Sequence, residues 1–98
     1  MDGLTITLEN LGGDRGRYVA RRPGDRLEAE MTFARQPGRI VIDHTGVPPA
    51  WEGQGVGSAL VARMANDVAA LGLKIVPRCS FMVAHIARKP ALQTLVAD

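Results

Sequence analysis

Strict alternation of apolar and polar residues marks two segments in the first third of the chain. Their apolar positions are Leu4, Ile6 and Leu8 in the first segment, and Leu27, Ala29, Met31 and Phe33 in the second. A period of two predicts a half-buried β-strand in each case. A third strand is expected around Tyr18 and Val19, between turn residues at 10–16 and 22–25. With a further turn at Gln36–Gly38, the pattern predicts an antiparallel meander.

The segment from Arg39 to Val47 lacks this alternation. Its centre, Ile40–Ile42, is continuously apolar, which is typical of an inner strand that is covered on both faces. Pro48 and Pro49 then end the strand, because proline brings no amide hydrogen to the ladder.

A helical period follows from about Gly55 to Leu71. The apolar positions at this spacing are Val56, Leu60, Met64, Val68 and Leu71, and they predict one buried helix face. The polar residues Arg63, Asn66 and Asp67 fall on or near its other side. Gly72 suits the residue just past the helix, where a left-handed backbone favours glycine.

The last quarter of the chain predicts one more strand and a second helix. Leu73–Val76 is a short buried strand that Pro77 ends. The helix is expected from Ser80, which we assign as its cap, to about Arg88. Pro90 breaks it, and Ala91–Val96 is expected to form a last helical turn.

The predicted order is therefore β-β-β-β-α-β-α, an α+β fold with helices packed on one mixed sheet. The 98 residues are expected to form a single domain, 1–98. The single cysteine, Cys79, excludes an intramolecular disulfide and a multi-cysteine metal site, and it favours a reducing compartment. Apolar runs stay far below the roughly 18 residues of a membrane span. We expect a soluble, cytoplasmic protein that contacts no membrane.

Charge argues against nucleic acid as a partner. The net charge is only +2, basic residues are interleaved with acidic ones, and aromatic residues make up 4% of the chain. Single-stranded nucleic acid needs aromatic platforms beside a basic groove, so we expect no nucleic-acid partner.

A glycine-rich turn, Gly53-Gln54-Gly55-Val56-Gly57-Ser58, joins the inner strand to the long helix. Glycines allow close backbone approach, and a helix N-terminus supplies unpaired amides and partial positive charge, which together suit a pyrophosphate. A P-loop would require a lysine before Ser58, and a dinucleotide fingerprint would require Gly or Ala at Ser58 or Leu60. The alternative is a glycine-rich connection that binds nothing.

The segment Glu52–Gly57 resembles the acyl-CoA signature Q/R-x-x-G-x-G/A of the GNAT superfamily of N-acetyltransferases, with Glu52 replacing the usual Gln or Arg. Three further blocks, Asp43–Pro48, Val76–Phe81 and Arg88–Pro90, occur in the same order in a family of very small stand-alone acetyltransferase-like proteins. This resemblance covers nearly the whole chain. It implies a truncated GNAT-like fold that binds acetyl-CoA or CoA.

The resemblance also implies where CoA binds. The strand around Val47 would hydrogen-bond the pantetheine arm, and the amides of the turn would hold the pyrophosphate. These amides belong to Gly53, Gln54, Gly55, Val56, Gly57 and Ser58. Arg88 and Lys89 would meet the adenosine or its phosphate, with Arg78 as a second candidate, while solvated surface charge is the alternative for all three. Trp51 is expected to cover the sheet edge or the ligand.

Two side chains are candidates for catalysis. Cys79 is expected at a helix start, which favours a reactive thiolate, and the resemblance places it close to the CoA sulfur. It is either an acyl-accepting nucleophile or a residue that lines the thioester pocket, and the alternative is a small buried hydrophobe. His44 could deprotonate the incoming amine with Asp43 orienting it, or be a structural histidine. His85 has no identifiable partner, and because no metal-binding spacing links the histidines and the cysteine, no metal is expected.

Three functions remain open from the sequence. The first is an acetyl-CoA-dependent N-acetyltransferase that acts on an unidentified small-molecule or peptide amine. The second is a non-catalytic CoA or acyl-CoA binding module that works with a partner protein. The third is a nucleic-acid or protein adaptor that uses the arginines. An exposed sheet edge could pair two copies, so we expect a monomer or a weak homodimer.

Overall fold

The computed structural model describes residues 3–97 and contains one five-stranded sheet. The strands are β1 (Thr5–Gly12), β2 (Arg15–Arg21), β3 (Glu28–Gln36), β4 (Arg39–Gly46) and β5 (Lys74–Pro77), and they lie in sequence order. The helices are η1 (Pro49–Trp51, a 3₁₀ turn), α1 (Val56–Leu71), α2 (Ser80–Arg88) and α3 (Pro90–Gln93). Only β4 and β5 are parallel neighbours; the other pairs are antiparallel. The predicted mixed sheet and element order are confirmed.

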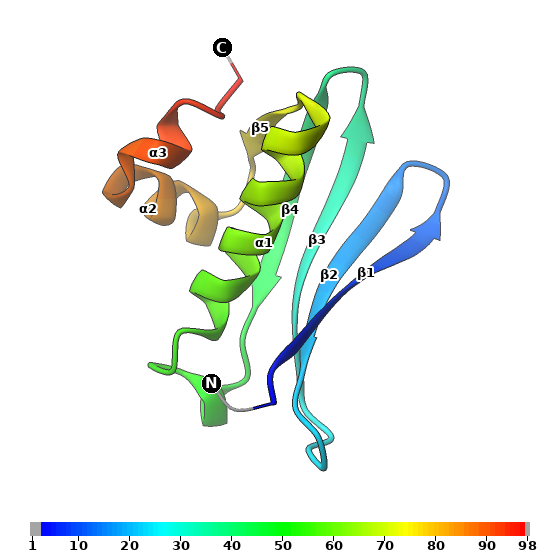
Figure 1. The fold of residues 1–98 in the computed structure, drawn as a ribbon, viewed down its shortest axis with the longest axis vertical. Helices are drawn as coiled ribbons and strands as arrows, with labels where there is room; N and C mark the ends of the chain where they lie inside the picture. Colours follow the sequence, from blue (N-terminus) through cyan, green and yellow to red (C-terminus); the bar gives the residue numbers. More distant parts are fainter. Residues whose placement is uncertain (1–2, 98) are drawn as a thin grey trace.

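One face of the sheet is apolar and packs against the helices. Its buried side chains are Tyr18, Ala20, Ala29, Met31, Phe33, Ile40 and Ile42. They share a face because they alternate along each strand and pair across strands. Figure 1 shows α1 lying along this sheet, with α2 and α3 beside it at the β5 end. Among the described residues, no helix has the length and apolar composition that crossing a bilayer requires.

The opposite face of the sheet is polar, so the prediction that Arg39–Val47 is covered on both faces was wrong. Within β4, Ile40 and Ile42 are buried, whereas Val41 is only partly buried. The reason lies in the neighbouring strands, whose alternate positions are charged. Arg17 on β2, for example, pairs with Glu9, Glu28 and Glu30 on this face. An apolar run of three residues therefore does not distinguish a strand buried on one face from one buried on both.

The first hairpin is tighter than the turn predicted at residues 10–16. β1 continues to Gly12, and Asn10 pairs with Gly16 on β2. The Asn10 side chain accepts a hydrogen bond from the Gly12 amide at 2.7 Å, and this local bond closes the turn. The hairpin leans away from α1 at its turn (Figure 1), so Leu8 is 48% exposed although alternation predicts that it is buried.

The predicted range of helix α1 is confirmed, but one of the residues predicted on its buried face is exposed. Val56, Leu60, Met64 and Val68 are buried, whereas Leu71 is 59% exposed. Gly72 adopts a left-handed conformation (φ 68°) after the last turn, and the Leu73 amide donates to the Val68 carbonyl. This reversal turns the chain back to the sheet, so that Leu73 is buried in place of Leu71.

Polar contacts fix α1 over the first two strands. The Tyr18 hydroxyl donates to Asp67 at 2.8 Å, and Arg63 donates both to Asp67 and to the Ile6 carbonyl. Burial and the Asp67 carboxylate raise the pKa of Tyr18. Arg63 and Asp67 were predicted near the exposed side of the helix, and instead they anchor it to β1 and β2.

The C-terminal segment differs in three details. Cys79 is the N-cap of α2 and Ser80 is its first residue, so the prediction of Ser80 as the cap was wrong by one position. α3 begins at Pro90, where a missing amide hydrogen is tolerated, and ends at Gln93. The predicted helical turn at Ala91–Val96 is thus present only over residues 91–93, and Val96 instead forms a parallel bridge with Ile75.

The two leucines of α1 give a test of the core. We expect Leu60→Ala, at a fully buried position, to lower the free energy of unfolding by about 2–5 kcal/mol because it leaves a cavity. Leu71→Ala is the matched control, since it makes the same substitution at an exposed position of the same helix, and we expect a loss of about 0.5 kcal/mol or less. Urea unfolding monitored by circular dichroism measures both. Equal losses would contradict the assignment of the buried face.

Candidate functional site

A cavity of about 480 Å³ lies between the first turn of α1 and the inner side of α2. Its lining residues are Val47, Trp51, Glu52, Gly53, Gly55, Val56, Gly57, Ser58, Phe81, His85 and Arg88. Seven of them were predicted to contact CoA: Val47, Gly53, Gly55, Val56, Gly57, Ser58 and Arg88. The other two predicted residues, Gln54 and Lys89, are not among its lining residues.

The turn before α1 has the backbone conformation of an anion site. Gly53 (φ 76°) and Gly55 (φ 81°) are both left-handed, which an L-residue adopts only with strain. Gly55 is the N-cap and brings no side-chain hydrogen bond to the helix. The first amides of α1 have no intrahelical acceptor by geometry, and they lie at the positive end of the helix beside the cavity.

Gly57 lets the two helices approach each other. A Cβ atom at this position would lie 2.4 Å from the Phe81 ring, a distance that forces something to move. The Phe81 ring in turn stacks on His85 with a centroid distance of 4.5 Å. The third glycine of the turn therefore has a packing role between α1 and α2, in addition to its place at the cavity.

His85 is the most unusual polar group of the cavity. It is only 6% exposed, and its Nε2 lies 3.2 Å from the Ser58 hydroxyl. The pKa of His85 is lowered, mainly by burial and to a smaller extent by the charge of the nearby Arg88. The backbone carbonyl of Phe81 offsets part of this decrease. Even so, no contact of Nδ1 among residues 3–97 meets hydrogen-bond geometry. His85 therefore links α2 to the first turn of α1 through Ser58.

Other polar side chains around the turn point elsewhere. The Gln54 amide donates to the Ala50 carbonyl at 3.2 Å. Trp51 is buried beneath Arg22, and its ring nitrogen donates to Asp25 at 3.2 Å. Trp51 thus forms a fixed wall of the cavity, and Gln54 contributes to the turn by its backbone.

Strands β4 and β5 separate beside the cavity. They pair only from Arg39 to Ile42 on β4, and the Arg78 amide then donates to the Ile42 carbonyl at 2.8 Å. β4 continues to Gly46, and within residues 3–97 this last stretch pairs only with β3. Its other edge faces the gap. The gap begins beside Val47, the residue that follows β4 and lines the cavity.

Cys79 lies at this gap and not in the cavity lining. Its Sγ is 3.6 Å from the Thr45 hydroxyl, and the side chain is partly buried against the core. The predicted position at a helix start holds, since Cys79 is the N-cap of α2. The thiol, two residues after the end of β5, therefore contacts β4 beyond the point where the two strands stop pairing.

His44 faces the polar side because β4 contains a bulge. His44 pairs with Thr32 and Ile42 pairs with Phe33, so Asp43 is the extra residue. Asp43 does not orient His44 as predicted. It accepts a hydrogen bond from Thr32 and pairs with Arg15 at 2.9 Å, and these contacts lower its pKa.

The ionic neighbour of His44 is Glu30, with the His44 Nε2 and the Glu30 Oε2 3.9 Å apart. Sequence reasoning missed Glu30, Phe81 and the role of His85. The i, i+4 spacing of Phe81 and His85, with Arg88 three residues later, was the available signal, because it places all three on one face of a helix.

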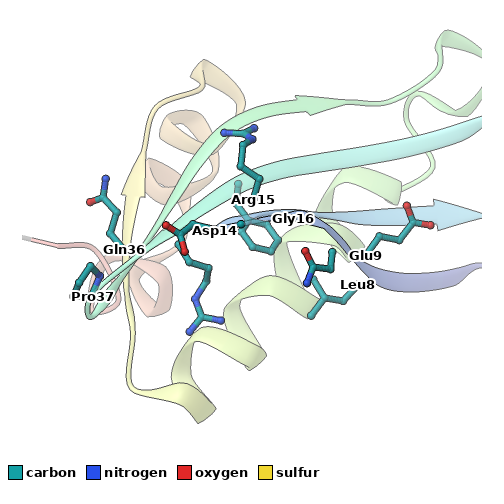
Figure 2. Close-up of a pocket in the computed structure, with 11 residues that line it drawn as sticks. Leu8, Glu9, Asp14, Arg15, Gly16, Gln36 and Pro37 are labelled. Carbon is teal, nitrogen blue, oxygen red and sulfur yellow. The ribbon is translucent and has the colours of Figure 1, made fainter.

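A larger cavity of about 740 Å³ lies at the other end of the sheet, where the β1–β2 and β3–β4 turns meet. Figure 2 shows its lining, with Leu8 on the side of α1 and Arg15 pointing away from that helix. It contains none of the predicted site residues, and no helix begins at it. Size alone therefore does not identify the site, and the smaller cavity is the one beside a helix N-terminus. Within residues 3–97, no three His, Cys, Asp or Glu side chains are grouped closely enough to share a metal ion.

Comparison with known proteins agrees with this fold. The sequence model of a family described as GCN5-related N-acetyl-transferase matches residues 17–95. Among solved structures, the chain is similar to the solution structure of a GCN5-like putative N-acetyltransferase from Staphylococcus aureus. The two share 28% sequence identity over 99% of this chain and 91% of the other, with a TM-score of 0.73. A search of curated proteins gave no match.

The lowered pKa of His85 predicts a pH dependence of stability. The unfolded chain binds the proton more readily than the folded one, so the free energy of unfolding should decrease as the pH falls below the ordinary value of 6.5. We expect this decrease between about pH 6.5 and 5, above the range where carboxylates such as Asp43 protonate. His85→Gln should reduce it. Urea unfolding at a series of pH values measures the effect, and parallel decreases in both proteins would contradict it.

Proposed function

The chain belongs to the GCN5-related N-acetyltransferase family, and from this premise we propose that it transfers the acetyl group of acetyl-CoA to an amine. The cavity at the start of α1 is the observation that carries this proposal. It brings together the first turn of α1, the buried His85, Arg88 and Val47, the residue that follows β4.

The residues present fit the phosphate groups of CoA. The amides of Val56, Gly57 and Ser58 belong to the first turn of α1 and are suited to the pyrophosphate. Arg88 lines the same cavity and supplies a cation for a phosphate. Glu52 lies in the same lining, but the cradle consists of backbone amides and does not depend on a side chain at position 52.

The free edge of β4 fits the pantetheine arm. Amide groups of pantetheine can pair with an exposed strand edge as an added strand does, and the edge from Asp43 to Gly46 faces the gap. Val47 continues this edge into the cavity. An arm bound in this way would place the thioester beside the edge of β4.

Acetyl-CoA supplies an acetyl group that is already activated as a thioester. The amine nitrogen attacks the carbonyl carbon, the C–S bond breaks, and CoA leaves as the thiol. We assign oxyanion stabilisation to a backbone amide near Val47 and proton removal from the amine to His44. Cys79 lines the gap beside Thr45, and we propose that the acetyl group passes directly from CoA to the amine.

Binding of CoA is the first test. We expect acetyl-CoA and CoA to raise the melting temperature, and NAD not to do so. Arg88→Gln should weaken CoA binding about 3- to 10-fold in calorimetry, since it removes a charge-assisted contact in a half-open cavity. Lys89→Gln is the matched control, because Lys89 is next to Arg88 in the sequence but does not line the cavity. We expect this substitution to change CoA binding less than about 2-fold.

Two outcomes separate the functions, and a third locates the contact of Arg88. No binding of CoA would overturn both catalysis and a CoA-binding module. Binding without release of CoA thiol in a broad screen of amines would favour the non-catalytic module. If Arg88 meets the 3′-phosphate, dephospho-CoA should bind equally to the wild type and to Arg88→Gln.

The role of Cys79 is tested separately. Because we expect direct transfer, mass spectrometry after incubation with acetyl-CoA should find no acetyl group on Cys79, and Cys79→Ala should retain turnover within about 10-fold. An acetylated Cys79 that transfers its group to an added amine would contradict direct transfer and make this residue the nucleophile.

A further inference from the structure

Glu30 divides its two carboxylate oxygens between two neighbours. Oε1 accepts a hydrogen bond from Arg17 at 2.8 Å. Oε2 faces the His44 Nε2 at 3.9 Å, which is longer than any hydrogen bond. Among the hydrogen bonds of residues 3–97, none ends on Oε2. One oxygen of Glu30 is therefore fixed by the protein, while the other remains able to accept a donor.

The imidazole of His44 is held close to this oxygen by the shape of β4. Its ring lies over Gly46, where a Cβ atom would be only 3.2 Å from Nε2. Glu30 is the cross-strand partner of Gly46, and Thr32 is the partner of His44. The glycine thus provides the space in which the ring approaches Glu30.

This pair lies next to the gap that the thioester would reach. Gly46 is the last residue of β4, and Val47, which follows it, lines the CoA cavity. His44 is 60% exposed in its side chain, so a molecule from solvent can reach it. The cavity opens on the helix side and the pair lies on the polar side, so two substrates could approach the gap from opposite faces.

The local charge favours a cation. Three carboxylates, Glu9, Glu28 and Glu30, surround only two guanidinium groups, those of Arg17 and Arg21. One negative charge in this cluster is therefore uncompensated. The next acidic residue on the face, Asp43, is already paired with Arg15.

We propose that Glu30 and His44 bind the acceptor as a primary ammonium group, and that the acceptor is a cationic amine without a neighbouring carboxylate. Alkyl amines, polyamines and lysine side chains belong to this class. His44 Nε2 and Glu30 Oε2 lie 3.9 Å apart. If an ammonium nitrogen lies about 2.8 Å from each of them, the angle between the two contacts at that nitrogen is about 90°, which is compatible with two hydrogen bonds from one ammonium group. This inference rests on the proposed function, because it gives that reaction its second substrate.

The proton balance follows from the two roles. Glu30 Oε2 accepts one N–H of the ammonium and stays ionised, while His44 Nε2 takes a proton and leaves the nitrogen lone pair free. The neutral amine forms the C–N bond, the C–S bond breaks, and the CoA thiolate takes the remaining extra proton from the nitrogen. His44 then returns its proton to solvent. Glu30 is thus a binding residue and His44 the base.

A structural ion pair is the other explanation for this contact. Exposed ion pairs contribute little to stability even at shorter distances, and Glu30 already has a close partner in Arg17. A stabilising role therefore predicts small effects on melting temperature and none on the Michaelis constant of the amine.

The test compares Glu30→Gln with Glu28→Gln. Both carboxylates bind the same nitrogen of Arg17, but only Glu30 faces His44. With butylamine as acceptor and saturating acetyl-CoA, Glu30→Gln should raise KM at least 10-fold with little change in kcat, and Glu28→Gln should change KM less than 2-fold. His44→Gln should lower kcat at least 10-fold. Wild-type protein should prefer butylamine over 4-aminobutyrate, which has the same chain length and an added carboxylate.

A binding measurement separates this proposal from the proposed function. Butylamine should shift the His44 ring proton resonances of the wild-type protein in NMR spectra without CoA, and should shift them far less in Glu30→Gln. No shift in the wild type, or an unchanged KM in Glu30→Gln, would overturn the amine site. Failure of CoA to bind would overturn the proposed transfer, while the NMR result would still decide whether the pair binds an amine.

Discussion

The separation of β4 from β5 after Ile42 is the constraint on which the rest of the site depends. Parallel pairing stops at Pro77, which brings no amide hydrogen, and the Arg78 amide makes the last bond to the Ile42 carbonyl. The bulge at Asp43 then alters the direction of β4. The result is an unpaired strand edge inside a sheet and not at its border. Unpaired backbone groups there are unfavourable unless water or a ligand meets them, so this edge suits a ligand that pairs with it as a strand does.

The two sides of this gap differ in the chemical groups that they present. On the helix side, backbone amides, Gly57 packed against Phe81, and a buried His85 make a cavity with few charged groups. On the polar side, carboxylates and guanidinium groups cover the sheet, and Val19 is buried beneath them. A phosphate ligand suits the first environment because the unpaired amides at the positive end of a helix can bind an anion. An ammonium group suits the second because a carboxylate there is already ionised and partly exposed.

The sequence predicted well whatever depends on a local period or on one residue type. The strand meander, the extent of α1, the left-handed Gly72 and the glycine turn at the helix start all follow from spacing and backbone freedom. It failed where a side chain's direction depends on distant partners. The bulge that turns His44 to the polar face is a mismatch between two strands, and no pattern within β4 contains it. Leu71 is a local failure: it followed the helical period, but the reversal at the adjacent Gly72 buries Leu73 in its place.

The exposure of the polar face also bears on how the proposed site could select an acceptor. A pocket that encloses a substrate needs elements on every side, whereas among residues 3–97 this face carries ion-paired side chains and His44 is 60% exposed on it. Shape can therefore contribute little discrimination on this face. Charge can contribute more, because Arg17 holds one oxygen of Glu30 in a fixed direction and leaves the other for a donor. A carboxylate on the acceptor would meet Glu9, Glu28 and Glu30, whose charge exceeds that of their two arginines. Selection by repulsion of acids, more than by fit, is the form of specificity that an open face of this kind supports.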